Sequence, residues 1–97
     1  MPDHVTKNAE QELVELLLSL IRIDSQNPDL VAGAPGERAI AEFCVAWLQA
    51  RGVDAWTDEV ASARFNAVAR VGRGNPVLTL CAHIDTVSIS GMERNGL

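Results

Sequence analysis

The residues with the clearest chemical potential are His83 and Asp85, which directly follow an apolar run at 77–82. Alternate side chains of an extended strand point to the same face, so we expect these two groups on one side of the chain. A neutral imidazole binds metal ions, and a nearby carboxylate fixes its tautomer and raises its basicity. Polar groups at the end of a buried strand also need partners, and a metal ion is one such partner.

Spacing alone leaves two interpretations of this His-x-Asp pair open. In the first, His83 is a metal ligand and Asp85 supports it. In the second, hydrogen bonds satisfy a histidine at a strand end, and Asp85 caps the next turn. The other histidine, His4, lies near the N-terminus, where we expect a frayed chain and no function.

Two helices are expected to precede the strands. Asn8 and Gln11 have the spacing of a capping box, and apolar residues then recur at helical spacing as far as Ile23. The width of this apolar face predicts a largely buried first helix. A second helix is expected over 36–51, with Gly52 as its C-terminal cap. Its apolar stripe consists of Ile40, Phe43, Cys44, Trp47 and Leu48.

Three strands are expected after the helices. Residues 53–59 and 65–71 alternate between apolar and polar side chains, whereas 77–82 is continuously apolar. Such a run is typical of a strand that is covered on both faces. The segments 65–71 and 77–82 could form an antiparallel hairpin. The pattern predicts an α/β fold, with two helices followed by about three strands of a mixed sheet.

Composition narrows the functional classes. The chain has 97 residues and a net charge of −5, without a cluster of basic residues, which argues against a nucleic-acid partner. Residues 13–23 are too few to span a bilayer, and we see no targeting signal, so we expect no membrane partner and a cytoplasmic location. Cys44 and Cys81 lie in apolar runs and are expected to be buried, inert thiols. A redox or thiol function built on Cys81 is the least favoured hypothesis.

The segment around His83 resembles the first metal-site motif of the M20 metallopeptidase family, which includes acetylornithine deacetylases, succinyl-diaminopimelate desuccinylases and carboxypeptidases. In that family an apolar strand leads into Gly-His-x-Asp-Thr-Val. Here Ala82 replaces the glycine, and Ser88 stands where many members have proline. The resemblance extends along nearly the whole chain, through residues 23–28, 36–53, 65–70 and 78–87. Residues 90–92 look most like the acetylornithine deacetylase branch.

This resemblance implies the α/β catalytic domain of a zinc peptidase, which holds two zinc ions, sometimes replaced by cobalt. His83 would bind one metal, and Asp85 would be the carboxylate of the catalytic site that orients this histidine. In the family, a metal-bridging water that a glutamate deprotonates attacks an amide carbonyl. The substrate would be an N-acyl amino acid, with N-acetylornithine as first choice, or a small peptide. The full-length protein would be a homodimer.

The other metal ligands of the family, its glutamate base and its dimerisation domain follow this motif. We therefore expect residues 1–97 to be the N-terminal segment of an incomplete catalytic domain, inactive alone, because a catalytic zinc normally takes three protein ligands. The alternative is a truncated or degenerate relative that acts only as a folded or partner-binding module. A reading frame that continues beyond Leu97 would favour the enzyme, and a stop codon there would favour the alternative.

Overall fold

The computed structural model describes residues 8–75 and 77–86. Its elements, in chain order, are α1 (Ala9–Ile21), α2 (Arg38–Gln49), β1 (Asp54–Ala61) and β2 (Arg64–Arg70). The two strands form an antiparallel sheet in which Asp54 pairs with Arg70 and Glu59 with Phe65. The described part of the chain is therefore a small α/β unit.

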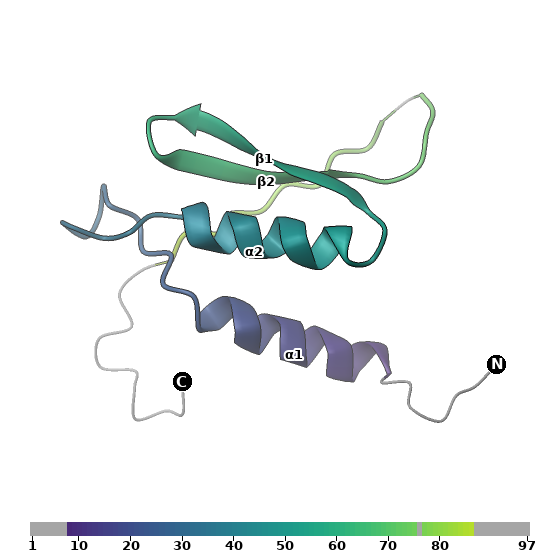
Figure 1. The fold of residues 1–97 in the computed structure, drawn as a ribbon, viewed down its shortest axis with the longest axis horizontal. Helices are drawn as coiled ribbons and strands as arrows, with labels where there is room; N and C mark the ends of the chain where they lie inside the picture. The colour runs from purple at the N-terminus through teal and green to yellow at the C-terminus, as the bar shows by residue number, and fades with distance from the viewer. Residues whose placement is uncertain (1–7, 76, 87–97) are drawn as a thin grey trace.

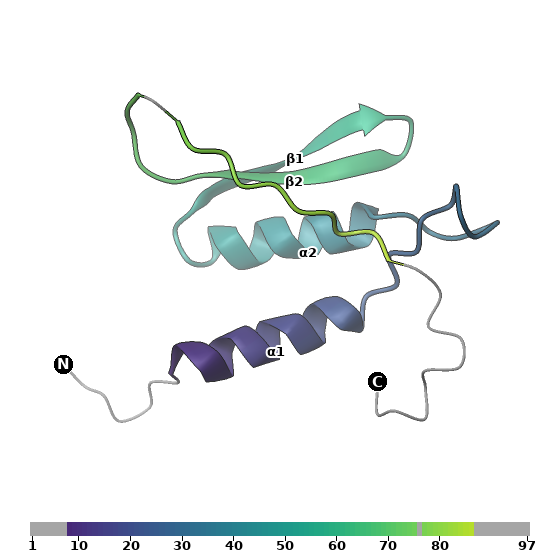
Figure 2. The ribbon, with the colours of Figure 1, turned by 180° about the vertical axis from the view of Figure 1, so that it is seen from behind.

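The elements lie in layers (Figure 1). α2 packs against both strands of the hairpin, and α1 lies on the other side of α2. The view from behind (Figure 2) shows the extended segment 77–86 returning from the hairpin toward the loop that follows α1. There Gln26 and Thr86 form a parallel bridge. This return places the C-terminal end of the described chain beside the loop that follows α1.

Local sequence signals fix the helix ends as predicted. The side chain of Asn8 accepts a hydrogen bond from the Gln11 backbone N–H at 2.7 Å. The Gln11 side chain accepts one from the Asn8 N–H at 3.1 Å, which completes the capping box. After α2, Gly52 has a φ of +79°, a conformation that suits glycine, and its N–H donates to the Gln49 carbonyl.

The buried core is small and lies around α2. Ile40 and Ala41 of α2 and Ala55 of β1 are its buried apolar residues in the described part of the chain. Ser25 and Glu37 are buried as well, and both belong to the polar connections described below. The core therefore joins α2 to the hairpin and to the loop before it.

The burial predicted for the first helix is not found. None of the residues of α1 is buried, and Leu13 and Leu17 are 64% and 52% exposed. The physical reason is the layer order: α1 lies at the outside of the layers, with α2 on one side of it, so Leu13 and Leu17 have no covering layer in the described chain. No helix among the described residues is long and apolar enough to cross a membrane.

The third expected strand is not confirmed among the described residues. Residues 77–82 are extended but unpaired, and Leu78 and Leu80 are 85% and 87% exposed. β2 pairs with β1 instead, through a tight turn in which Ala63 has a φ of 58°. An open cavity of about 810 Å³ separates β2 from 77–84. The layers that a continuously apolar strand needs on both faces are missing from the described residues.

Candidate functional site

His83 and Asp85 contact each other, although no regular strand holds them. The Nδ1 atom of His83 lies 3.2 Å from Oδ1 of Asp85 and 3.0 Å from the Asp85 backbone carbonyl oxygen. The His83 side chain is 86% exposed, whereas that of Asp85 is 28% exposed. The carboxylate is therefore the more firmly held member of the pair.

The contacts of Nδ1 determine which nitrogen of His83 carries the proton. A carbonyl oxygen and an ionised carboxylate can only accept hydrogen bonds, so Nδ1 must be the donor to both. In the neutral ring, Nε2 then has a free lone pair. This is the form in which an imidazole binds a metal ion, with its other nitrogen held by a carboxylate.

Asn27 holds the other oxygen of Asp85. Its side-chain amide donates to Oδ2 of Asp85 at 2.7 Å. This bond is the main reason that the pKa of Asp85 lies below its usual value, and the hydrogen bond from His83 contributes in the same direction. Both oxygens of Asp85 thus face donors of the protein, which suits a supporting carboxylate better than a metal ligand.

A short stretch of main-chain pairing joins the two segments of the site. The Thr86 N–H donates to the Ser25 carbonyl at 3.0 Å, and the Asn27 N–H donates to the Thr86 carbonyl at 3.2 Å. The hydroxyls of Ser25 and Thr86 lie 3.4 Å apart. Ser25 is fully buried, so this pairing fixes the position from which the site residues project.

The sequence singled out His83 and Asp85 but gave Asn27 and Ser25 no role in the site. The signal for them was indirect: both belong to the 23–28 segment, which ends at a proline after the first helix. Because 58 positions separate Asn27 from Asp85, their contact has no local pattern. His4 and residues 87, 88 and 90–92, to which the sequence also pointed, lie outside the described residues.

The donor set fits one ligand of a metal site. Nε2 of His83 is the available nitrogen, and Asp85 supplies the supporting carboxylate. Among the described residues, no group of three or more histidine, cysteine, aspartate or glutamate side chains could hold a metal ion. A catalytic zinc takes three protein ligands. Residues 8–75 and 77–86 therefore do not by themselves contain the three ligands of such a site.

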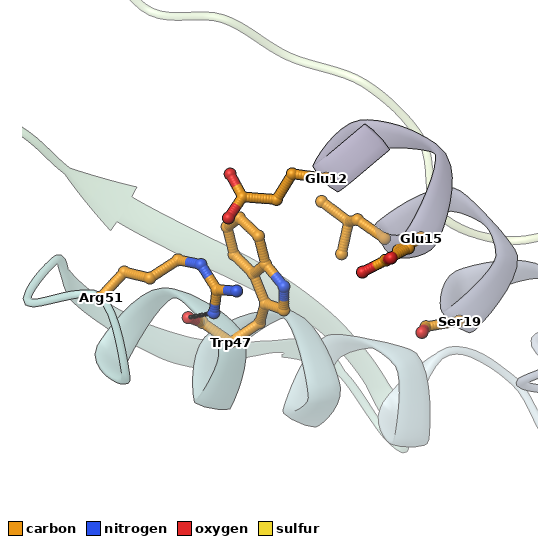
Figure 3. Close-up of a pocket in the computed structure, with 6 residues that line it drawn as sticks. Glu12, Glu15, Ser19, Trp47 and Arg51 are labelled. Atoms are coloured by element: carbon orange, nitrogen blue, oxygen red, sulfur yellow. Dashed lines mark hydrogen bonds between the residues drawn. The ribbon is translucent and has the colours of Figure 1, made fainter. Parts of the chain in front are cut away.

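A second candidate region lies between the two helices (Figure 3). Glu12 and Glu15 of α1 face Trp47 and Arg51 of α2 across a cavity of about 150 Å³. The Arg51 guanidinium lies 3.5 Å from the centre of the Trp47 ring and donates to the Trp47 carbonyl. Trp47 is half-buried, in agreement with the packing role predicted for it. Its contacts support the helix and give no separate chemistry.

The two thiols differ, contrary to the prediction that both are buried. Cys44 in α2 is half-buried, and this burial raises the pKa of its thiol. Cys81 is exposed because the segment that carries it has no covering layer. Cys81 is therefore accessible to reagents from solution.

We predict that iodoacetamide alkylates Cys81 at least about tenfold faster than Cys44, since exposure and thiolate fraction set the rate. The time course of modification at pH 8, followed by mass spectrometry of tryptic peptides, measures both rates. Cys81→Ser should remove the fast phase and leave the slow one. Equal rates at the two thiols would show that 77–82 is covered in solution.

Comparison with known proteins gives a distant match along most of the chain. The chain is 29% identical over 83 residues to a protein named probable succinyl-diaminopimelate desuccinylase from Staphylococcus epidermidis, and equally to its counterpart in a second strain. The match covers 86% of this chain but only 19% of either relative, so the chain spans about a fifth of their length. No family model and no solved structure matches the chain. The similarity suggests the M20-type hydrolases, at a distance that leaves the activity to be tested.

Proposed function

We propose that this chain is the N-terminal part of a metal-dependent amidohydrolase of the M20 type, in which His83 binds zinc and Asp85 supports it. The observation that carries the proposal is the pairing of Nδ1 of His83 with the Asp85 carboxylate, which leaves Nε2 free. The distant similarity to probable desuccinylases supports the same class of reaction.

The substrate of the whole enzyme would be an N-acyl amino acid or a small peptide. The resemblance of residues 90–92 to the acetylornithine deacetylase branch favours N-acetylornithine as the substrate. The similarity to probable succinyl-diaminopimelate desuccinylases favours an N-succinyl amino acid. When bound, zinc, or cobalt in its place, would polarise the amide carbonyl and lower the pKa of a bound water. We further propose that the full-length protein acts as a homodimer in the cytoplasm, without a nucleic-acid or membrane partner.

In this proposal the site residues of this chain hold His83, the metal ligand, in its orientation. They would not transfer a proton to the substrate. Asp85 holds His83 by Nδ1, and Asn27 together with the Ser25–Thr86 pairing holds Asp85. Such supporting groups commonly change metal affinity or activity by about 10–100-fold when they are removed. The remaining ligands and the general base would come from a longer polypeptide.

A larger sheet would also account for the exposed apolar segment. We propose that 77–82 becomes a strand of a mixed sheet when the rest of the catalytic domain is present. Its exposed leucines and the open cavity beside β2 support this arrangement. The parallel bridge between Gln26 and Thr86, next to an antiparallel hairpin, is consistent with mixed strand directions.

The exposed apolar surface also favours a second candidate function, that of a partner-binding module without catalysis. Three leucines of α1 (Leu13, Leu17 and Leu18) and those of 77–80 are exposed in the described chain. Large apolar patches on soluble proteins often mark interaction surfaces. The DNA that follows the Leu97 codon separates the two hypotheses: an open frame with further acidic and histidine ligands supports the enzyme, and a stop codon supports the module.

Cobalt titration of the 97-residue chain tests the ligand role of His83. Paramagnetic broadening of the His83 ring signals should occur at a lower cobalt concentration than broadening of the His4 signals, because Asp85 raises the basicity of His83. Asp85→Ala should remove the difference, and His4→Ala should leave the His83 response unchanged. Equal broadening of both histidines would contradict the proposal.

Hydrolysis assays of the same chain test the incompleteness of the site. With added zinc, we expect no cleavage of N-acetylornithine or N-succinyl-diaminopimelate, because a catalytic zinc needs three protein ligands and no such group is found among the described residues. Turnover by the 97-residue chain would contradict the proposal that its metal site is incomplete.

A further inference from the structure

The side chain of Asn27 is fixed at both ends of its amide group. Its Nδ2 donates to Oδ2 of Asp85 at 2.7 Å, and its Oδ1 accepts from the Asp29 N–H at 2.8 Å. An N–H can only donate and a carboxylate can only accept, so these two partners determine which way the amide points. The Asn27 N–H also pairs with the Thr86 carbonyl, one residue beyond Asp85.

This arrangement makes a chain of three polar groups. Asn27 occupies Oδ2 of Asp85, and Oδ1 of Asp85 lies toward Nδ1 of His83. His83 is 86% exposed, so packing does little to orient its ring. Its orientation depends on the acceptor atoms of Asp85, and the direction of the Asp85 carboxylate depends in turn on Asn27.

We infer that Asn27 is a positioning residue for His83: by holding Oδ2 of Asp85, it turns Oδ1 toward Nδ1 and keeps Nε2 free for a metal ion. The functional meaning of this inference rests on the proposed function. Hydrogen bonds to ionised groups are stronger than those between neutral groups, which makes the bond to Asp85 the dominant contact of the Asn27 side chain.

Two substitutions remove the Nδ2 donor but leave an oxygen that can accept from the Asp29 N–H. Asn27→Ser does so without adding charge, and Asn27→Asp keeps the shape but places a carboxylate against Asp85. Both should lower the ratio of the Nδ1–H to the Nε2–H tautomer of neutral His83 by at least about threefold, since the Asp85 carboxylate, one of the two acceptors of Nδ1–H beside the Asp85 backbone carbonyl, is no longer fixed. Long-range proton–nitrogen NMR spectra of the 97-residue chain measure this ratio, with His4→Ala used to assign the two rings.

Exchanging the side chains of Asn27 and Asp85 distinguishes a positioning role of Asn27 from a merely structural one. In Asp85→Asn the new amide can turn either its oxygen or its nitrogen to His83, so the tautomer ratio should fall. In the double variant N27D/D85N, the carboxylate at 27 binds the amide nitrogen at 85 and leaves the amide oxygen facing Nδ1. The double variant should therefore restore the ratio to within about twofold of the unsubstituted chain.

The controls separate this inference from the proposed function. Asn66→Asp adds the same charge at an exposed site of β2 and should leave the tautomer ratio unchanged. The role of Asn27 is overturned if Asp85→Ala lowers the tautomer ratio but Asn27→Ser does not. It is also overturned if the ratio in the double variant is as low as in the single variants. In both cases the His83–Asp85 pair stands. Loss of the β1–β2 amide signals in both Asn27 variants would show a structural role and overturn it too. Failure of cobalt to bind His83 while these tautomer shifts occur would count against the proposed function alone.

Discussion

Replacing Arg64 by methionine should destabilise the chain more than the loss of an exposed ion pair would. Arg64 donates to Oε1 of Glu37 at 2.7 Å and to Oδ2 of Asp29 at 3.0 Å. The Glu37 side chain is only 9% exposed, and its other oxygen has no hydrogen-bond partner among the described residues. Without Arg64, a buried carboxylate would lose its compensating charge.

The size of this effect follows from the position of the two groups. Breaking an ion pair is most costly where one charge stays buried and unpaired, as the Glu37 carboxylate would. The Arg64 side chain is 26% exposed, so solvent screens part of this interaction. Because the pair joins the first residue of β2 to the residue before α2, its loss should separate the hairpin from the helix.

A double variant distinguishes a lost ion pair from lost packing. In E37M/R64M no charge remains buried, so this variant should recover most of the stability that Arg64→Met removes. Glu42→Gln breaks the exposed Arg38–Glu42 pair and should change the free energy of unfolding by less than about 0.5 kcal/mol. Urea unfolding, followed by the fluorescence of Trp47 and Trp56, measures the free energy of unfolding of Arg64→Met, of the double variant and of Glu42→Gln. A single Arg64→Met variant as stable as the unsubstituted chain would refute the argument.

Local signals in the sequence predicted the elements well. The Asn8–Gln11 capping box, the apolar stripe of α2 and the positive φ at Gly52 each involve residues close in sequence, and each is confirmed. The positions of strands β1 and β2 agree with the expected ranges to within about two residues, although β2 pairs with β1 and not in the possible hairpin of 65–71 with 77–82. These features depend on short-range hydrogen bonds and backbone preferences, which a single sequence contains.

Contacts between distant residues could not be predicted in the same way. The bond from Asn27 to Asp85 spans 58 positions and that from Arg64 to Glu37 spans 27, so no periodic pattern connects their partners. His83 and Asp85 were predicted on one side of a strand, and they do meet, but as neighbours in an extended segment and not in a sheet. The sequence thus indicated the reactive pair but missed the amide that fixes it.

Burial was the least predictable property, because it depends on what lies against an apolar face. The leucines at 77–82 indicate a segment that needs cover on two sides, and the leucines of α1 indicate a face that needs a second layer. In the described residues the segment 77–82 is exposed and the face of α1 is only partly covered. An apolar pattern therefore predicts which surface will be buried in a complete assembly, and the available partners decide whether that burial takes place.

Two matched side-chain substitutions test whether an apolar residue is buried in solution or only has an apolar pattern. Ile40 is 4% exposed beneath the hairpin, whereas Leu80 is 87% exposed in the unpaired segment. Ile40→Ala should lower the free energy of unfolding by about 2–4 kcal/mol, because it removes buried methyl groups and leaves a cavity. Leu80→Ala should change it by less than about 0.5 kcal/mol, as is usual for exposed positions.

The comparison is informative because both variants remove a four-carbon side chain down to its first carbon, so composition and helix or strand propensity contribute little to the difference. Hydrogen exchange of the β1–β2 amides, measured alongside urea unfolding, should accelerate in Ile40→Ala and remain unchanged in Leu80→Ala. If Leu80→Ala were as damaging as Ile40→Ala, residues 77–82 would be packed in solution as the buried strand that their sequence predicts. If a second copy of the chain supplied the covering layer, the measured destabilisation would depend on protein concentration.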